Sequence, residues 1–262
     1  MNQVLSKDGT VIAFDRSGQG PAVVLVGGAF QYRAIDPPTA HLAALLAEQF
    51  TVFHYDRRGR GESSDTQPYA VEREMEDLEA LIQEAGGSAC VFGMSSGGVL
   101  ALDAAARGLA ITKLASYEPP FNSGDEQSRR AAESYTRELT ALLSEGRRGD
   151  AAALAMTTWG APAEAVAGMR QTPIWPLFEA VAPTLAYDDA LMGDGAVPAQ
   201  RLASIAVPTL VMAGGASPAF MQEAAQAVAR ALSNARLRTL AGQTHDVDPE
   251  VLAPVLVEFF AG

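Results

Sequence analysis

The chain has a single cysteine, which excludes an internal disulfide as a source of stability. Cys90 lies inside an apolar stretch, so we expect it to pack as a small hydrophobic side chain. Basic residues are also few, because 19 lysines and arginines stand against 31 acidic residues, for a formal net charge of −12. This charge argues against nucleic acid and against an anionic membrane surface as partners.

Long apolar runs are absent as well. None reaches the roughly 20 residues that a membrane-spanning helix needs, and the first eight residues lack the apolar centre of a signal peptide. We therefore expect a cytoplasmic protein. No metal-ligand spacing, phosphate-binding glycine loop or dinucleotide fingerprint occurs, so we expect no metal and no cofactor.

Short apolar runs alternate with helical patterns over the first part of the chain. The expected strands are residues 10–15, 22–26, 51–55, 88–92, 111–117, 208–212 and 235–240. Continuous β-branched runs are typical of strands that are buried on both faces of a parallel sheet. The pattern predicts an α/β fold with a mostly parallel sheet and helices on both faces.

The alternation pauses in the middle of the chain, where residues 121–206 show helical patterns only. We expect a single domain with its core in residues 1–120 and 207–262, and with a helical cap inserted at about 121–206. Such an insertion would lie over the carboxyl ends of the strands, where open α/β sheets bind ligands.

The most informative motif is G-x-S-x-G at residues 93–97, between an expected strand and an expected helix. In this setting the motif is typical of a nucleophile elbow, in which the serine occupies a strained turn. The flanking glycines let strand and helix approach each other closely. The motif is short, but its context favours Ser95 as a nucleophile over an inert glycine-serine turn.

A serine hydroxyl needs a neighbouring base to act as a nucleophile. The chain has three histidines. His41 lies in a helical pattern, and His54 lies within a strand, where we expect a buried, hydrogen-bonded structural role. His245 follows the last strand in a loop, so we predict that it is the base. The Ser96 N–H, at the start of the next helix, is an expected oxyanion donor.

Three motifs in order resemble the capped α/β-hydrolase family over nearly the whole chain. They are D-x-R-G-x-G-x-S at residues 56–63, the elbow, and the glycine-to-histidine loop at 242–245. The resemblance implies a second oxyanion donor, the Ala29 N–H, in the loop after the strand 22–26. We expect the turn at 56–63 to be structural, with its charges paired with one another.

Two departures from the family pattern matter. Gly27-Gly28 stands where the family usually has His-Gly, and the loop 213–218 lacks the usual aspartate. Ser217 stands about where that acid is expected. We predict that Glu118, at the end of the strand 111–117, is the triad acid instead, because it should reach the same edge of the sheet.

The expected chemistry is hydrolysis of an ester, thioester or lactone of a small to medium apolar acyl group by a Ser-His-Glu triad. Trp159 and Trp175 are candidates for an apolar substrate pocket, and packing of the cap onto the core is the alternative for each. Two other functions stay open: a lyase or cyclisation enzyme that uses the triad for proton transfer, and a non-catalytic ligand-binding protein. The expected partner is a small-molecule substrate, and the expected assembly is a monomer or homodimer.

Overall fold

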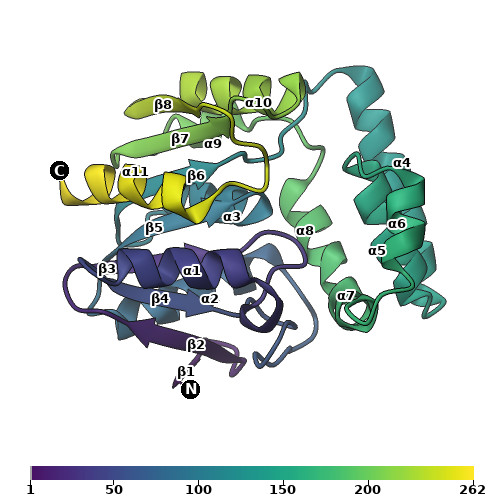
Figure 1. The fold of residues 1–262 in the computed structure, drawn as a ribbon, viewed down its shortest axis with the longest axis horizontal. Helices are drawn as coiled ribbons and strands as arrows, with labels where there is room; N and C mark the ends of the chain where they lie inside the picture. The colour runs from purple at the N-terminus through teal and green to yellow at the C-terminus, as the bar shows by residue number, and fades with distance from the viewer. Residues whose placement is uncertain (1) are drawn as a thin grey trace.

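The computed structural model describes residues 2–262 and contains one eight-stranded sheet in the order β1-β2-β4-β3-β5-β6-β7-β8 (Figure 1). Strands β3 to β8 are parallel, whereas β2 pairs antiparallel with both β1 and β4. The strands are β1 (Asn2–Leu5), β2 (Val11–Ser17), β3 (Ala22–Val26), β4 (Thr51–Tyr55), β5 (Ala89–Met94), β6 (Ile111–Tyr117), β7 (Thr209–Gly214) and β8 (Ala235–Leu240). The predicted fold class is confirmed.

Helices cover both faces of this sheet, because alternate side chains of each strand point to opposite faces. Val24 and Val26 of β3 pack in the apolar cluster that includes α2 (Val71–Glu84), α3 (Ser96–Ala106) and α10 (Ala219–Ala231). Val23 and Leu25 pack on the other face, with α1 (Pro37–Leu46) and α11 (Pro249–Ala261). The continuous apolar run of β3 therefore reflects a strand that is buried on both sides.

A helical segment joins β6 to β7. It consists of α4 (Glu126–Ser144), α5 (Arg148–Thr158), α6 (Ala163–Met169), α7 (Trp175–Val181), the 3₁₀ turn Ala182–Thr184, α8 (Leu185–Met192) and α9 (Ala199–Leu202). Figure 1 shows most of this segment at the side of the sheet toward which β4 and β6 point. Its apolar core also includes Phe30 and Tyr32, which follow β3. The segment is therefore anchored on the loop at the carboxyl end of β3.

Within residues 2–262, none of the helices is both long and apolar enough to cross a lipid bilayer.

His54 lies in β4 between two neighbouring strands and is 7% exposed, so it is buried as expected. Its imidazole makes no hydrogen bond to another of residues 2–262, contrary to the expectation of a hydrogen-bonded role. Burial lowers the pKa of its imidazole, although Asp36 and Asp56 act in the opposite direction. As the pH falls below the ordinary histidine pKa of about 6.5, the unfolded chain binds a proton that the folded protein does not. Stability is therefore lost toward acid through this group.

We accordingly expect His54→Gln to show a shallower loss of unfolding free energy than the wild type between pH 7.5 and 5.5. Urea unfolding at several pH values measures this slope. An unchanged slope in the variant would show that His54 is not a source of the pH dependence.

Candidate active site

Ser95 occupies the sharp turn between β5 and α3, with φ 54° and ψ −126°. A non-glycine residue takes up this conformation only at a cost in free energy. The turn is possible because its flanking glycines carry no side chain. A Cβ on Gly93 would collide with the Gly97 carbonyl, and one on Gly97 would collide with the carbonyls of Val26 and Gly27. The predicted strand–turn–helix context of the motif is thus present.

Glu118 follows β6 directly and is fully buried. Its Oε2 lies 2.7 Å from His245 Nδ1, the contact that the sequence argument predicted. Its Oε1 accepts a 2.8 Å hydrogen bond from the Gly214 N–H at the end of β7. Glu118 itself has φ 46°, so the backbone is strained here as it is at Ser95. The carboxylate is therefore held from two sides in one orientation.

The charge state of Glu118 follows from these contacts. Burial raises the pKa of its carboxyl group, but the hydrogen bonds from His245 and Gly214 outweigh it, and the pKa lies below its usual value. The Ser217 hydroxyl also lowers this pKa from close by, although it makes no well-aligned hydrogen bond of its own. An ionised carboxylate on Nδ1 fixes the tautomer that leaves Nε2 free to accept a proton.

The other acidic residues near His245 have different roles. Asp248 caps α11, where its side chain accepts the Glu250 N–H. Asp246 is exposed.

Ser95 and His245 lie at the same edge of the sheet. The Ser95 N–H donates to the Tyr117 carbonyl at 2.9 Å, and the Tyr117 hydroxyl donates to the Thr244 carbonyl, one residue before His245. Among residues 2–262, the Ser95 hydroxyl makes no hydrogen bond to His245; in hydrolytic enzymes this contact is often loose before substrate binds.

The loop after β3 packs against the elbow. A Cβ on Gly28 would lie 2.9 Å from Ser95 Cβ and 3.0 Å from the Met94 carbonyl, which explains why glycine follows β3. Within the described residues, neither the Ala29 N–H nor the Ser96 N–H donates a hydrogen bond to another protein group. Both amides that the sequence singled out are thus without a protein acceptor among these residues.

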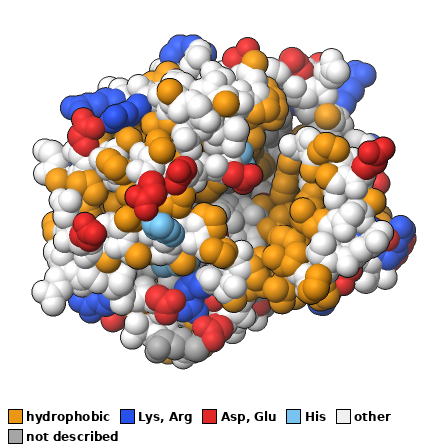
Figure 2. Space-filling view, viewed as in Figure 1, with side chains coloured by type: hydrophobic (Ala, Val, Ile, Leu, Met, Phe, Trp, Pro, Cys, Tyr) orange, Lys and Arg blue, Asp and Glu red, His pale blue; other side chains and the backbone are white. Residues whose placement is uncertain are grey.

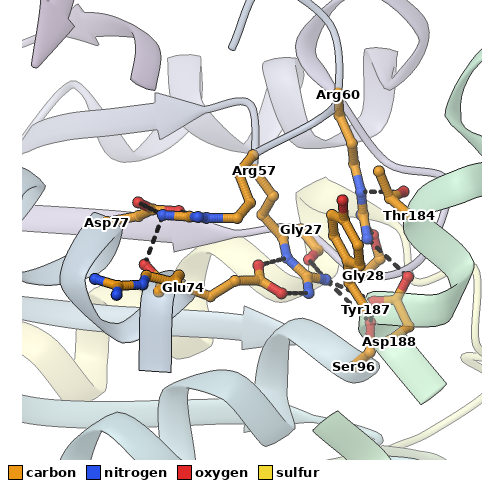
Figure 3. A network of polar contacts seen from close by, with 12 residues as sticks. Gly27, Gly28, Arg57, Arg60, Glu74, Asp77, Ser96, Thr184, Tyr187 and Asp188 are labelled. Atoms are coloured by element: carbon orange, nitrogen blue, oxygen red, sulfur yellow. Dashed lines mark hydrogen bonds and ion pairs between the residues drawn. The ribbon is translucent and has the colours of Figure 1, made fainter. Parts of the chain in front are cut away.

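The turn at residues 56–63 differs from the expectation that its charges pair with one another. Its three arginines, Arg57, Arg58 and Arg60, are at most 2% exposed, and each pairs with at least one acid from another part of the chain. Their partners are Glu74, Asp77, Asp188 and Asp8. Figure 3 shows the surroundings of Arg57 and Arg60. Asp56 pairs with Arg33 instead. The turn therefore ties together distant elements of the chain.

The two tryptophans have different surroundings. Trp159 is 44% exposed, and its ring meets Phe30, one residue after Ala29, edge to face at 5.8 Å. Trp175 is 5% exposed, and its Nε1 donates to Glu179 at 2.8 Å within the core of the helical segment. Trp175 thus follows the packing alternative, whereas Trp159 lies beside the loop that carries Ala29.

No group of three or more metal-ligating side chains occurs among the residues that the structure describes.

The chain matches the model of the alpha/beta hydrolase family over residues 23–255, and it belongs to that family. It is 58% identical to an alpha/beta hydrolase from Sphaerobacter thermophilus, whose crystal structure it matches with a TM-score of 0.90 over 99% of this chain and 100% of the other. The protein is therefore an enzyme of the alpha/beta hydrolase class.

More distant similarities show the fold alone. The enol-lactonase from Burkholderia xenovorans is 20% identical, with a TM-score of 0.65 over the full length of both chains.

Among curated sequences, the uncharacterized hydrolase YraK of Bacillus subtilis is 34% identical over 39% of this chain and 38% of its own length. The polyketide synthase ThaQ of Burkholderia thailandensis is 30% identical over 91% of this chain, which spans only 12% of that protein.

Proposed function

We propose that the protein is a serine hydrolase that cleaves an ester, thioester or lactone of a small to medium apolar acyl group through Ser95, His245 and Glu118. The observation that carries the proposal is the 2.7 Å contact between Glu118 and His245 Nδ1 at the edge of the sheet where the elbow presents Ser95. A nucleophile, a base and a buried carboxylate that orients the base are the three parts that acyl transfer needs.

In this mechanism, Ser95 Oγ attacks the acyl carbon while His245 Nε2 takes the hydroxyl proton. Glu118 stabilises the imidazolium that forms. The negative charge on the carbonyl oxygen is stabilised by the Ala29 and Ser96 N–H groups. Collapse of this intermediate expels the alcohol or thiol, which receives the proton from His245. Water then attacks the acyl-enzyme, again with His245 as base, and releases the acid.

An apolar acyl group is supported by the surface of the helical segment. Figure 2 shows hydrophobic side chains gathered beside a hollow in the middle of the molecule, over this segment. Four large apolar residues of the segment are exposed: Trp159, Met169, Ile174 and Leu177. We take this segment to be the cap of the active site. The similarity to part of a polyketide synthase is the reason to retain thioesters among the substrates.

The proposal is tested with a series of nitrophenyl esters from acetate to decanoate. We expect measurable turnover by the wild type, with kcat/KM rising as the chain lengthens from acetate. Failure of every ester and of the matching thioesters to turn over would contradict the proposed hydrolase activity.

Trp159 provides a sharper test of the pocket. Trp159→Ala removes an apolar surface beside Phe30, so we expect kcat/KM for the octanoate ester to fall about 10-fold relative to that for the acetate ester, roughly what the loss of a few buried methylene contacts costs. Leu237→Ala is the matched control, because Leu237 is equally exposed but lies on the edge strand β8. An unchanged ratio in Trp159→Ala would exclude this side chain from the substrate site.

A further inference from the structure

A cluster of four buried charges lies next to Gly27, Gly28 and Ser96 (Figure 3). Arg57 and Arg60 come from the turn after β4, Glu74 from α2 and Asp188 from α8, and none of the four side chains is more than 4% exposed. Asp188 accepts from Arg57 at 2.8 Å and from Arg60 at 2.7 Å. Arg57 also forms a two-pronged pair with Glu74. The two positive and two negative charges balance.

The same cluster contacts both segments that carry the proposed oxyanion donors. Arg60 Nη1 donates to the Gly28 carbonyl, and Arg57 Nη1 donates to the Gly27 carbonyl at 3.3 Å. Asp188 Oδ1 accepts a 2.7 Å hydrogen bond from the Ser96 hydroxyl. One carboxylate of the helical segment is thus linked to the loop after β3 and to the start of α3.

The contact with Gly28 controls the direction of an N–H group. A trans peptide is planar, so its C=O and N–H point in opposite directions. Holding the Gly28 carbonyl toward Arg60 therefore turns the Ala29 N–H away from Arg60. The Gln31 N–H also donates to this carbonyl, at 3.2 Å. The Gly28–Gln31 turn that this bond closes would hold the Gly28–Ala29 peptide only weakly by itself. Phe30 within the turn has φ 63°, a strained value for a residue with a Cβ.

Stability does not by itself explain such a cluster. Removing charged groups from water costs free energy that ion pairing often only balances, so buried ion pairs are weak evidence of a stabilising role. In addition, Arg57 and Arg60 occupy the two positions of D-x-R-G-x-G that the motif leaves open. Arg58, at the motif's fixed position, pairs instead with Asp77 and Asp8. It makes no hydrogen bond to the described residues of the loop after β3 or of the start of α3.

We propose that Asp188 and Arg60 are positioning residues for the oxyanion hole, and that helix α8 thereby sets the orientation of both the Ala29 and the Ser96 donors. This inference rests on the proposed function, because it assigns a supporting role to the same site. Asp188 fixes the Arg60 guanidinium, Arg60 holds the Gly28–Ala29 peptide, and the Ser96 hydroxyl bond to Asp188 holds the first turn of α3.

The test compares Asp188→Asn and Arg60→Gln with Arg58→Gln, a matched control that removes an equally buried arginine of the same turn. Active sites are counted by fluorophosphonate labelling, and kcat and KM are measured with a nitrophenyl ester. Loss of one oxyanion donor costs about 100- to 1,000-fold in kcat. Since the donors remain but lose their support, we expect kcat to fall about 10- to 100-fold, with KM changed less than about 3-fold.

Inhibition provides a readout that a purely structural role would not move. The carbonyl carbon of a trifluoromethyl ketone is attacked by Ser95, and the resulting tetrahedral adduct carries its negative charge on the former carbonyl oxygen. We expect the affinity of this inhibitor to fall in parallel with kcat/KM in the Asp188 and Arg60 variants only. Arg58→Gln should lower the melting temperature but retain kcat per labelled site. Equal losses of kcat in all three variants, or normal kcat in Asp188→Asn and Arg60→Gln, would overturn the proposal.

Two further arms keep the test decisive. If the charge variants do not fold, Thr184→Val leaves all four charges in place. It removes the 3.0 Å hydrogen bond that Thr184 Oγ1 accepts from Arg60 Nε and the 2.8 Å bond that it donates to the Val181 carbonyl. It should still lower kcat about 3-fold; an unchanged kcat there counts against the positioning role. If wild type is neither labelled nor active, the hydrolase proposal fails and the positioning role falls with it. A labelled, active wild type beside unaffected variants overturns the positioning role alone.

Discussion

We expect Ser95→Ala to lower kcat by about 10⁵- to 10⁶-fold, as loss of the nucleophile does when it acts as a unit with its base. The elbow geometry does not depend on the hydroxyl, because Ser95 Oγ makes no hydrogen bond to another protein group among the residues that the structure describes. The variant should therefore fold normally, with a melting temperature close to that of the wild type. Stopped assays on nitrophenyl esters and thermal unfolding measure the two quantities.

Ser144→Ala is the matched control for this experiment. Its hydroxyl is exposed at the end of α4 and donates only to the Ala141 carbonyl, so its removal should leave kcat unchanged. Residual activity of Ser95→Ala within 100-fold of the wild type would mean that another group carries the reaction.

The second large effect concerns Glu118→Gln. We expect kcat to fall about 1,000- to 10,000-fold, because an amide N–H directed at His245 Nδ1 favours the tautomer with its proton on the wrong nitrogen. The glutamine keeps the shape of the side chain and can still accept the Gly214 N–H through its carbonyl oxygen. The loss should therefore appear in kcat more than in folding, which circular dichroism and urea unfolding would show.

Two companion variants make the Glu118 test specific. Asp246→Asn, next to the base in sequence but exposed, should reduce kcat less than 3-fold. Ser217→Asp in the Glu118→Gln background places a carboxylate in the loop where the family usually carries its acid, and we expect it to restore kcat at least about 10-fold. A near-normal Glu118→Gln, or an Asp246→Asn that is equally impaired, would contradict the assignment of the acid.

The sequence was sufficient for the fold, because runs and periods show its strands and helices locally. It was also sufficient to expect that Glu118 and His245 meet, although they are 127 residues apart, because each follows a parallel strand of one sheet. Strand runs such as 22–26 and 51–55 show their burial directly, and parallel strands bring their carboxyl ends to one edge. The loop 213–218, which follows β7, lacks an acid. Glu118 at the end of the neighbouring strand β6 was then the carboxylate that chain geometry favoured as the partner of His245.

The buried charge cluster was beyond local reasoning. Arg57 and Asp188 are 131 residues apart, and no period or motif links a turn after β4 to a helix of the inserted segment. One signal was present: Glu74 lies four residues before Leu78, on the apolar stripe of α2 rather than on its acidic face. An acid on an apolar stripe needs a buried cation as partner, and the three arginines of the turn were the candidates.

The tryptophans show a similar limit. Aromatic residues in an inserted helical segment can line a pocket or pack the segment together, and composition does not distinguish these roles. Trp175 packs because Glu179, one turn later, accepts its indole N–H and Phe178 lies beside the ring. Trp159 is the residue directly after α5, and 44% of its surface stays exposed.

The central claim is that Ser95 is the nucleophile, and covalent labelling tests it most directly. Wild type and Ser95→Ala are incubated with a fluorophosphonate, and the labelled protein is digested and mapped by mass spectrometry. The account predicts one label per chain, on Ser95, and none in the variant. A label on Ser96 or Ser217, or turnover by a wild type that the reagent never modifies or inhibits, would contradict it and would favour proton-transfer chemistry without an acyl-enzyme.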